Sequence, residues 1–79
     1  MAVRRNRSPK EKSFDFVVGR LITEARLAKR ISQKEMAAQL EISRQTLYAY
    51  EIGAMRCPVF VLARISVVLG VEVTRLMPV

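Results

Sequence analysis

Histidine is absent from this sequence of 79 residues, and cysteine occurs only once, at Cys57. A lone cysteine excludes an intrachain disulfide and favours a reducing compartment, where we expect its thiol to be inert. The chain also lacks a nucleophile–base pair, a metal-ligand spacing and a glycine-rich phosphate loop. We therefore expect no catalytic residue, no metal site and no cofactor, and we do not expect an enzyme.

Long apolar runs are also missing. No segment approaches the length of a membrane span, and the N-terminus lacks the apolar stretch of a signal peptide. These absences predict a soluble cytoplasmic protein with no membrane partner. Apolar residues still make up 51% of the chain, which is enough for one small domain with one packed core.

Acidic residues are scarce: the chain has 7 Asp and Glu against 14 Lys and Arg, a formal net charge of +7. Such an excess favours a polyanionic partner, above all nucleic acid. Much of it lies in residues 1–13, which hold five basic residues and one acidic residue. We interpret residues 1–13 as a flexible basic arm, either a solvated tail or a contact to DNA, and residues 14–79 as the folded domain.

Hydrophobic periodicity predicts an all-α fold, a compact bundle of five short helices with short loops. The first helix lies within residues 8–30. It starts at Ser8, where Pro9 and Glu11 complete a capping-box pattern, or one turn later at Ser13. Its expected apolar stripe, with Gly19 as a close helix contact, is Phe14, Val17, Val18, Leu21, Ala25 and Ala28. The other helices are expected at residues 31–41, 44–51 and 59–70, with a last turn at 71–77.

The third helix has two unlike faces. Leu47 and Tyr50 face inward, whereas Gln45 and Ala49 lie on the opposite side. Residues 31–41 and 44–51, each with a serine cap and joined by a short turn, form a helix-turn-helix, whose second helix enters the DNA major groove with its front end nearest the bases. Gln45 suits adenine, Arg44 suits guanine or a phosphate, and the methyl group of Ala49 suits thymine.

The residues from Gly19 to Leu76 resemble the phage-repressor, or Xre/Cro-like, helix-turn-helix family, which is lambda-repressor-like in fold. The matching stretches are GRLITEAR, ISQKEMAAQLEIS, TLYAYEIG and ARISVVLGVEVTRL. The resemblance implies that Gln33 touches DNA and that Arg26 forms a structural ion pair with Glu51. It assigns base reading to the front of the third helix, that is, to Arg44, Gln45, Thr46 and Ala49.

Further phosphate contacts are expected from residues at helix N-termini and beside the third helix. Together with Gln33, these are Lys34, Ser43, Tyr48 and Arg56. Two positions depart from the family pattern, because Arg30 and Glu41 stand where glycine is usual. A left-handed conformation at Glu41 would cost about 1–2 kcal/mol.

The fourth helix is apolar on nearly every side. Val59, Leu62, Ile65 and Leu69 form its expected core stripe, and a helix that is apolar all round must be buried. We expect the remaining surface to form a two-fold homodimer interface. Its expected residues are Phe60, Val61, Arg64, Val67, Val68, Val71 and Met77. The alternative is intramolecular cover by the C-terminal tail, with Val71, Val73, Met77 and Val79.

Together these features predict a homodimeric, sequence-specific regulator of transcription, a repressor that reads a near-palindromic site on double-stranded DNA. We expect it in the cytoplasm of a prokaryote or of a phage-infected cell, associated with the nucleoid when bound. An antitoxin that binds a toxin and a restriction-modification controller protein remain open within the same fold. A protein-interaction module that uses the third helix is the alternative from another class.

Overall fold

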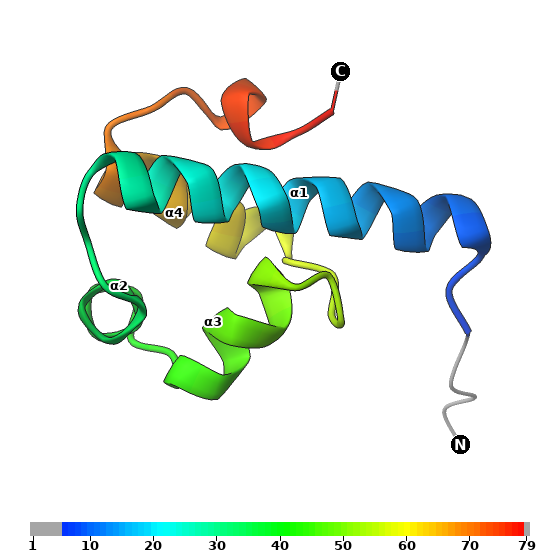
Figure 1. The fold of residues 1–79 in the computed structure, drawn as a ribbon, viewed down its shortest axis with the longest axis horizontal. Helices are drawn as coiled ribbons and strands as arrows, with labels where there is room; N and C mark the ends of the chain where they lie inside the picture. The colour runs from blue at the N-terminus through cyan, green and yellow to red at the C-terminus, as the bar shows by residue number, and fades with distance from the viewer. Residues whose placement is uncertain (1–5, 79) are drawn as a thin grey trace.

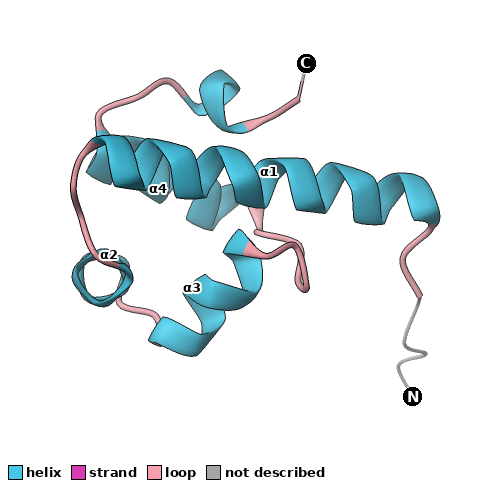
Figure 2. Ribbon diagram, in the orientation of Figure 1, coloured by secondary structure: helices cyan, strands magenta, loops and turns pink. Residues whose placement is uncertain are grey.

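The computed structural model describes residues 6–78, which form four α-helices and one short 3-10 helix. The helices are α1 (Pro9–Ala28), α2 (Gln33–Leu40), α3 (Arg44–Glu51) and α4 (Val59–Leu69), and the 3-10 helix is η1 (Val73–Leu76). Helix α1 runs the length of the molecule, with α2 and α3 on one side of it and η1 on the other (Figure 1). No strand occurs in the described part of the chain (Figure 2).

The prediction of five helices is therefore correct in class but not in count. The fifth element is a 3-10 turn of only four residues. Met77 next to it is extended, with φ −129° and ψ 141°. Pro78 disfavours the helical conformation at Met77, so the turn cannot lengthen into an α-helix.

Serine caps fix the starts of the first three helices. Helix α1 begins at Pro9, where the Ser8 hydroxyl accepts from the Glu11 N–H at 3.1 Å and the Glu11 carboxylate accepts from the Ser8 N–H at 2.9 Å. Ser32 and Glu35 repeat this capping box at α2, which lowers the pKa of Glu35 through the hydrogen bonds from Ser32. The start at Ser8 is thus confirmed over Ser13, and residues 9–13, assigned to the basic arm, belong to α1. Residues 1–5 of that arm lie outside the described residues.

Among residues 6–78, two that are not glycine adopt the left-handed conformation, Arg30 with φ 57° and Glu41 with φ 58°. Arg30 lies in the connection between α1 and α2, and Glu41 is the C-cap of α2; both stand where the family pattern has glycine. Each costs about 1–2 kcal/mol relative to an ordinary helical residue. The N–H of Ile42, next to Glu41, reaches back to the Ala37 carbonyl at 3.1 Å, which fixes the turn that precedes α3.

The core lies between α1, α2, α3, α4 and η1. Its fully buried side chains are Ile22, Met36, Leu40, Leu47, Ile65, Leu69 and Leu76. The apolar stripe expected on α1 is wrong by part of a turn, because Phe14, Val17 and Ala28 are exposed. The buried face of α1 is instead Asp15, Val18, Gly19, Ile22 and Arg26. Val59, expected in the core stripe of α4, is also exposed and is the first residue of that helix.

Candidate nucleic-acid interface

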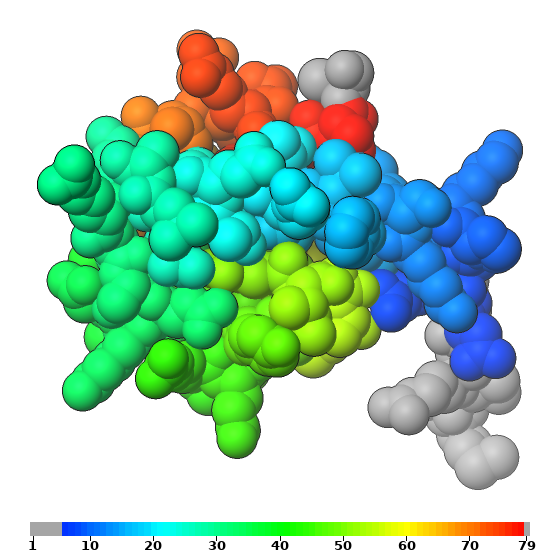
Figure 3. All heavy atoms as spheres, viewed as in Figure 1, coloured from blue at the N-terminus to red at the C-terminus, as the bar shows by residue number. Residues whose placement is uncertain are grey.

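Helix α3 lies at the lower edge of the molecule and turns one face outward (Figure 3). Leu47, Tyr50 and Glu51 are buried against the other helices. Arg44 and Gln45 at the front of the helix are exposed, and Thr46 and Ala49 are half-buried. None of the four residues expected to read bases is enclosed in the core. The outward face therefore combines two long hydrogen-bonding side chains with a small methyl group, as the periodicity predicted.

Ser43 caps the N-terminal end of α3. The Ser43 hydroxyl accepts from the Thr46 N–H at 3.0 Å and donates to the Thr46 hydroxyl at 2.8 Å. These bonds leave the N–H groups of Arg44 and Gln45, in the first turn, pointing out of the helix end, where the helix dipole favours an anion. A shallow groove between α2 and α3 is lined there by Gln33, Arg44, Gln45 and Tyr48.

Behind this face a buried ion pair joins α1 to the end of α3. Arg26 Nε donates to Glu51 Oε2 at 2.7 Å, and Arg26 Nη2 donates to Glu51 Oε1 at 3.0 Å. Thr23 Oγ1, at 3.1 Å, and Gln33 Nε2, at 3.0 Å, also donate to Glu51 Oε1. Burial raises the pKa of Glu51, but the hydrogen bonds from Arg26 and Gln33 outweigh burial and hold it below the usual value. The structure thus brings together the pair that the resemblance implied.

The residues expected to bind phosphate differ in their exposure and in the hydrogen bonds they already make. Lys34 and Ser43 are exposed beside the groove, and Tyr48 is 53% exposed. Gln33 is half-buried, and one hydrogen of its amide nitrogen is donated to Glu51 Oε1, which leaves the second amide hydrogen for a contact outside the protein. A contact from this second hydrogen to a phosphate would keep the bond to Glu51 in place.

Arg56 lies in a different environment from the one expected for a phosphate contact. Its Nε donates to Asp15 Oδ1 at 2.8 Å, and its guanidinium lies 5.6 Å from the centre of the Phe14 ring. A second carboxylate, that of Glu11, lies 3.8 Å from Arg56 Nη1. Its positive charge is therefore already balanced within the protein. Nearby Cys57 is buried enough that the pKa of its thiol rises to about 12.

The sequence interpretation missed two residues that build this region, Arg7 and Asp15. Arg7 Nη1 donates to Asp15 Oδ2 at 2.8 Å, and Asp15 is only 3% exposed. The signal was present in the spacing, because Asp15, Val18, Ile22 and Arg26 lie on one helical face. The basic partners of Asp15 lie 8 and 41 positions away in the sequence, so the spacing alone does not identify them.

The surface expected to form a dimer interface is only partly open. Phe60 is 72% exposed and Val67 is 80% exposed, and both line a shallow groove on α4. The other apolar members of the set, Val61, Val68, Val71 and Met77, are half-buried against the core. In the alternative interpretation the C-terminal tail would cover this surface; Val71, Val73 and Met77 of the tail pack against the core, and η1 contacts both α1 and α4. Val79 lies outside the described residues.

Arg64 sits at the edge of this surface. Its Nη1 donates to the Leu40 carbonyl at 3.1 Å and its Nη2 to the Gln39 carbonyl at 3.4 Å, and its guanidinium lies 6.0 Å from the Phe60 ring centre. It thus caps the C-terminal end of α2 from α4. Sequence reasoning gave Arg64 an interface role and missed this contact.

Other kinds of site find no support in residues 6–78. They contain no group of three or more His, Cys, Asp or Glu side chains that could hold a metal ion. Within the same residues, no helix is both long and apolar enough to cross a membrane.

Comparison with known proteins gives one family match. The family described as Helix-turn-helix matches residues 22–76. These residues include the Arg26–Glu51 pair, α2, α3, α4 and η1, and they leave out most of α1. No curated protein sequence matches the chain.

Several solved structures share the fold. The restriction-modification controller protein C.AhdI from Aeromonas hydrophila is 22% identical, with a TM-score of 0.74 over 78% of this chain and 94% of that one. The clp gene regulator ClgR from C. glutamicum is also 22% identical, with a TM-score of 0.76 over 87% of this chain and 86% of that one. Hydroxypropylphosphonic acid epoxidase from S. wedmorenis is 25% identical, with a TM-score of 0.77, but the match covers 85% of this chain and only 36% of the epoxidase.

Proposed function

Because this chain belongs to the Xre-like helix-turn-helix family, we propose that it is a sequence-specific DNA-binding regulator of transcription. The observation that carries the proposal is the outward face of α3, where Arg44 and Gln45 are exposed at a serine-capped helix end. In a helix-turn-helix this end meets the base edges in the major groove. The match to the epoxidase covers 36% of that enzyme, so this chain corresponds to only part of it. That partial match is consistent with a regulator that is not itself an enzyme.

In the proposed complex, four residues of α3 read bases. Gln45 pairs through its amide with adenine N6 and N7, and Arg44 pairs with guanine O6 and N7. Ala49, one turn further along α3, contacts a thymine methyl group, and Thr46 reads a neighbouring base. Each good bidentate pair discriminates by about 1–3 kcal/mol against the wrong base.

Phosphate contacts surround this surface and set the overall affinity. Lys34 and Ser43 at the fronts of α2 and α3, Tyr48 on α3 and the second amide N–H of Gln33 flank the groove described above. Such contacts fix the register of a protein on DNA and make its binding sensitive to salt. Arg56 contributes little to them in this proposal, because Asp15 holds its guanidinium.

The regulator is proposed to act as a homodimer and as a repressor. The exposed Phe60 and Val67 on α4 offer an apolar surface that a second copy of the chain would cover. A two-fold axis there would place two copies of α3 about 34 Å apart, one turn of DNA, and so select a near-palindromic site. Binding at such a site within a promoter, in the nucleoid of a prokaryote or on phage DNA, would exclude polymerase.

A restriction-modification controller is the second candidate within the same class. The fold match covers 94% of the controller protein C.AhdI, so a fold of this size can form nearly the whole of such a protein. An antitoxin of the same fold would also bind DNA through α3 and would in addition bind a toxin. The DNA-binding proposal is common to all three.

Selection of bound duplexes from a random library, followed by sequencing, tests the proposal. The expected result is a single enriched motif with two half-sites, centred about 10 base pairs apart and related by two-fold symmetry. Enrichment of one half-site alone would support DNA reading without the dimer. A library from which no duplex is enriched would reject the proposed function and favour a protein-interaction module.

A further inference from the structure

A cluster of charged groups lies at the other end of α3 from the proposed base-reading residues. We call it the Asp15 clasp. It consists of Arg7, Asp15, Arg56 and the backbone carbonyls of Gly53 and Ala54. Asp15 is 3% exposed and accepts from Arg7 Nη1 and from Arg56 Nε, each at 2.8 Å.

Arg7 also holds the chain that follows α3. Its Nη1 donates to the Gly53 carbonyl and its Nη2 donates to the Ala54 carbonyl, both at 3.0 Å. These carbonyls follow directly on the C-terminus of α3, where the helix dipole is negative and a cation is favourable. One guanidinium group therefore binds a buried carboxylate on α1 and the segment that closes α3.

The clasp depends on residues outside the family match. Arg7 and Asp15 precede residue 22, at which the match to the helix-turn-helix family begins. The Arg26–Glu51 pair, by contrast, lies within the matched residues 22–76. The end of α3 is thus held twice, once by the matched pair and once by residues that precede the matched segment.

We propose that Arg7 and Asp15 are positioning residues for DNA reading, which set the tilt of α3 and hence the placement of Gln45. This inference rests on the proposed function. Helix α3 has eight residues and is about 12 Å long. A tilt of about 5° at its clasped end would move its front by about 1 Å, which is enough to spoil a bidentate base contact.

Asp15 also favours sequence-specific binding in a second way, by limiting contacts to phosphate. It occupies two arginines that would otherwise be available to any phosphate, and such contacts bind all sequences alike. Loss of the carboxylate would loosen α3 and weaken the hold on both cations, leaving Arg7 with the Gly53 and Ala54 carbonyls and Arg56 with the Glu11 carboxylate at 3.8 Å. The affinity for a preferred duplex would fall, and the affinity for an unrelated duplex would stay the same or rise.

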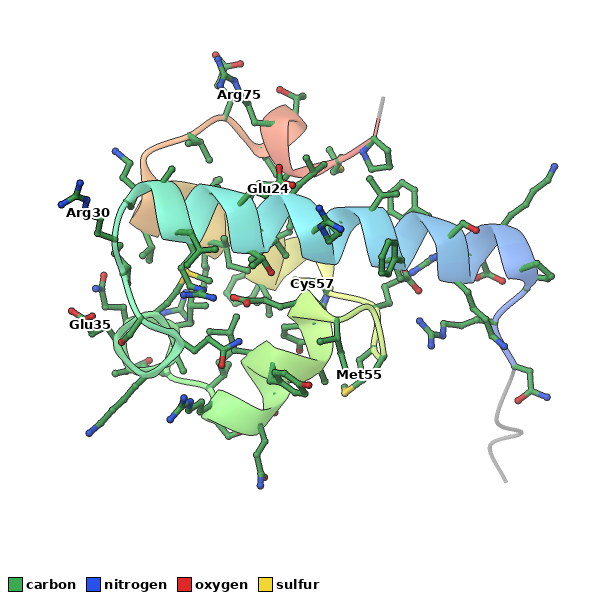
Figure 4. All side chains as sticks on the ribbon, in the orientation of Figure 1. Glu24, Arg30, Glu35, Met55, Cys57 and Arg75 are labelled. Atoms are coloured by element: carbon green, nitrogen blue, oxygen red, sulfur yellow. The ribbon has the colours of Figure 1, made fainter. Side chains whose placement is uncertain are left out.

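The test compares Asp15→Asn and Arg7→Gln with two variants matched in charge, Glu24→Gln and Arg75→Gln. Glu24 and Arg75 lie on the side of α1 away from α3 (Figure 4). Dissociation constants are measured over a range of salt for the duplex that the wild-type chain selects and for a scrambled duplex of the same length. Circular dichroism gives the folded fraction of each variant under the assay conditions.

For both clasp variants we expect the ratio of the two affinities to fall about tenfold, mainly through the selected duplex. The matched variants should leave this ratio within about twofold of wild type. Arg7→Lys keeps the charge but lacks the fork that spans both carbonyls, so its ratio should lie between those of wild type and Arg7→Gln.

If the ratio of the affinities for the selected and the scrambled duplex is unchanged in the clasp variants, the inference is overturned. It is also overturned if the affinities for both duplexes fall together, in step with the folded fraction. Arg7 has a side chain that is 29% exposed, so Arg7→Gln keeps the test valid if Asp15→Asn does not fold. A wild-type chain that prefers no duplex would reject the proposed function, and this inference with it. A wild-type preference that survives in the clasp variants would reject the inference alone.

Discussion

Gly19 of α1 lies directly against the backbone carbonyls of Tyr50 and Glu51 at the end of α3. A Cβ atom at position 19 would collide with both carbonyl oxygens, which are backbone atoms and cannot rotate away. Helices α1 and α3 therefore approach as closely as they do only because residue 19 has no side chain. This contact lies between the Arg26–Glu51 pair and the Asp15 clasp, and the three together hold the C-terminal end of α3 against α1.

Gly19→Ala should lower the free energy of unfolding by about 1–3 kcal/mol, because the added methyl group must push α3 away from α1. Helix propensity alone predicts the opposite sign, since alanine in a helix is more stable than glycine by about 0.5–1 kcal/mol. Urea unfolding followed by circular dichroism measures the difference. Ala38→Gly, at an exposed position of α2, reports the propensity effect on its own. A stabilised Gly19→Ala variant would show that the two helices can separate at no cost.

Glu51→Gln should lower the free energy of unfolding strongly, although the side chain keeps its shape and loses only its charge. Glu51→Gln leaves Arg26, whose side chain is 9% exposed, without a counter-ion, and such losses cost about 3–5 kcal/mol. Glu24→Gln is the control, because Glu24 is exposed and pairs with the exposed Arg20 in the preceding turn. Equal unfolding free energies for the two variants at pH 7 would contradict a structural role for the pair.

The same pair makes stability depend on pH. The pKa of Glu51 is lowered from 4.5 in the folded chain, so the stabilisation is complete above that pH and is lost as the pH falls through the folded value. Wild type should therefore lose stability when the pH drops below about 4.5, and Glu51→Gln should lose less. Some dependence should remain in the variant, because the pKa of Glu35 is lowered too. Curves of unfolding free energy between pH 3 and 7 with the same slope for both proteins would contradict this.

The helix-turn-helix could be predicted from the sequence because its signals are local. Ser8, Ser32 and Ser43 each begin a helix at the position the capping pattern gave, and the third helix has the expected bounds, residues 44–51. The exposure of Arg44 and Gln45 follows from helical periodicity alone. These features need only residues within one turn of each other.

The phase of α1 could not be predicted in the same way. Phe14 and Phe16 look like core residues and are 40% and 52% exposed, whereas Asp15 between them is buried. Burial of a carboxylate is favourable only when charged partners surround it. Those partners, Arg7 and Arg56, come from segments that the fold alone brings to α1. For the same reason the hydrogen bond from the Gln33 amide to the Glu51 carboxylate could not be predicted from the sequence.

Gln45→Ala should affect one base pair of the preferred duplex. If Gln45 binds adenine, its loss should weaken binding by about 1–3 kcal/mol and relax the preference at that position only. Lys34→Ala is the contrast, because a phosphate contact should weaken all duplexes alike and lower the salt slope by about 1. Binding of both variants to a library of single-base substitutions separates these patterns. Identical profiles for the two variants would remove Gln45 from base reading.

Cys57 should react slowly with alkylating reagents in the folded chain. Burial raises the pKa of its thiol to about 12, so little of the reactive thiolate is present at pH 8. The rate of iodoacetamide labelling, followed by mass spectrometry, should rise sharply when the chain is unfolded in urea. A folded-state rate equal to the unfolded one would show that the loop after α3 opens freely, which the contacts of Arg56 with Asp15 oppose.

Val67→Glu should break the proposed homodimer without unfolding the chain. Val67 is 80% exposed, so the charge costs nothing in the monomer, whereas in a dimer it would be buried without a partner. Leu27→Glu, at an exposed position on α1, makes the same change in charge away from this surface. Sedimentation at tens of micromolar should then give about 18 kDa for wild type and Leu27→Glu, twice the 9.0 kDa of the chain, and the monomer mass for Val67→Glu. A wild-type chain that stays monomeric, both free and with its selected duplex, would mean that Phe60 and Val67 face solvent or another partner.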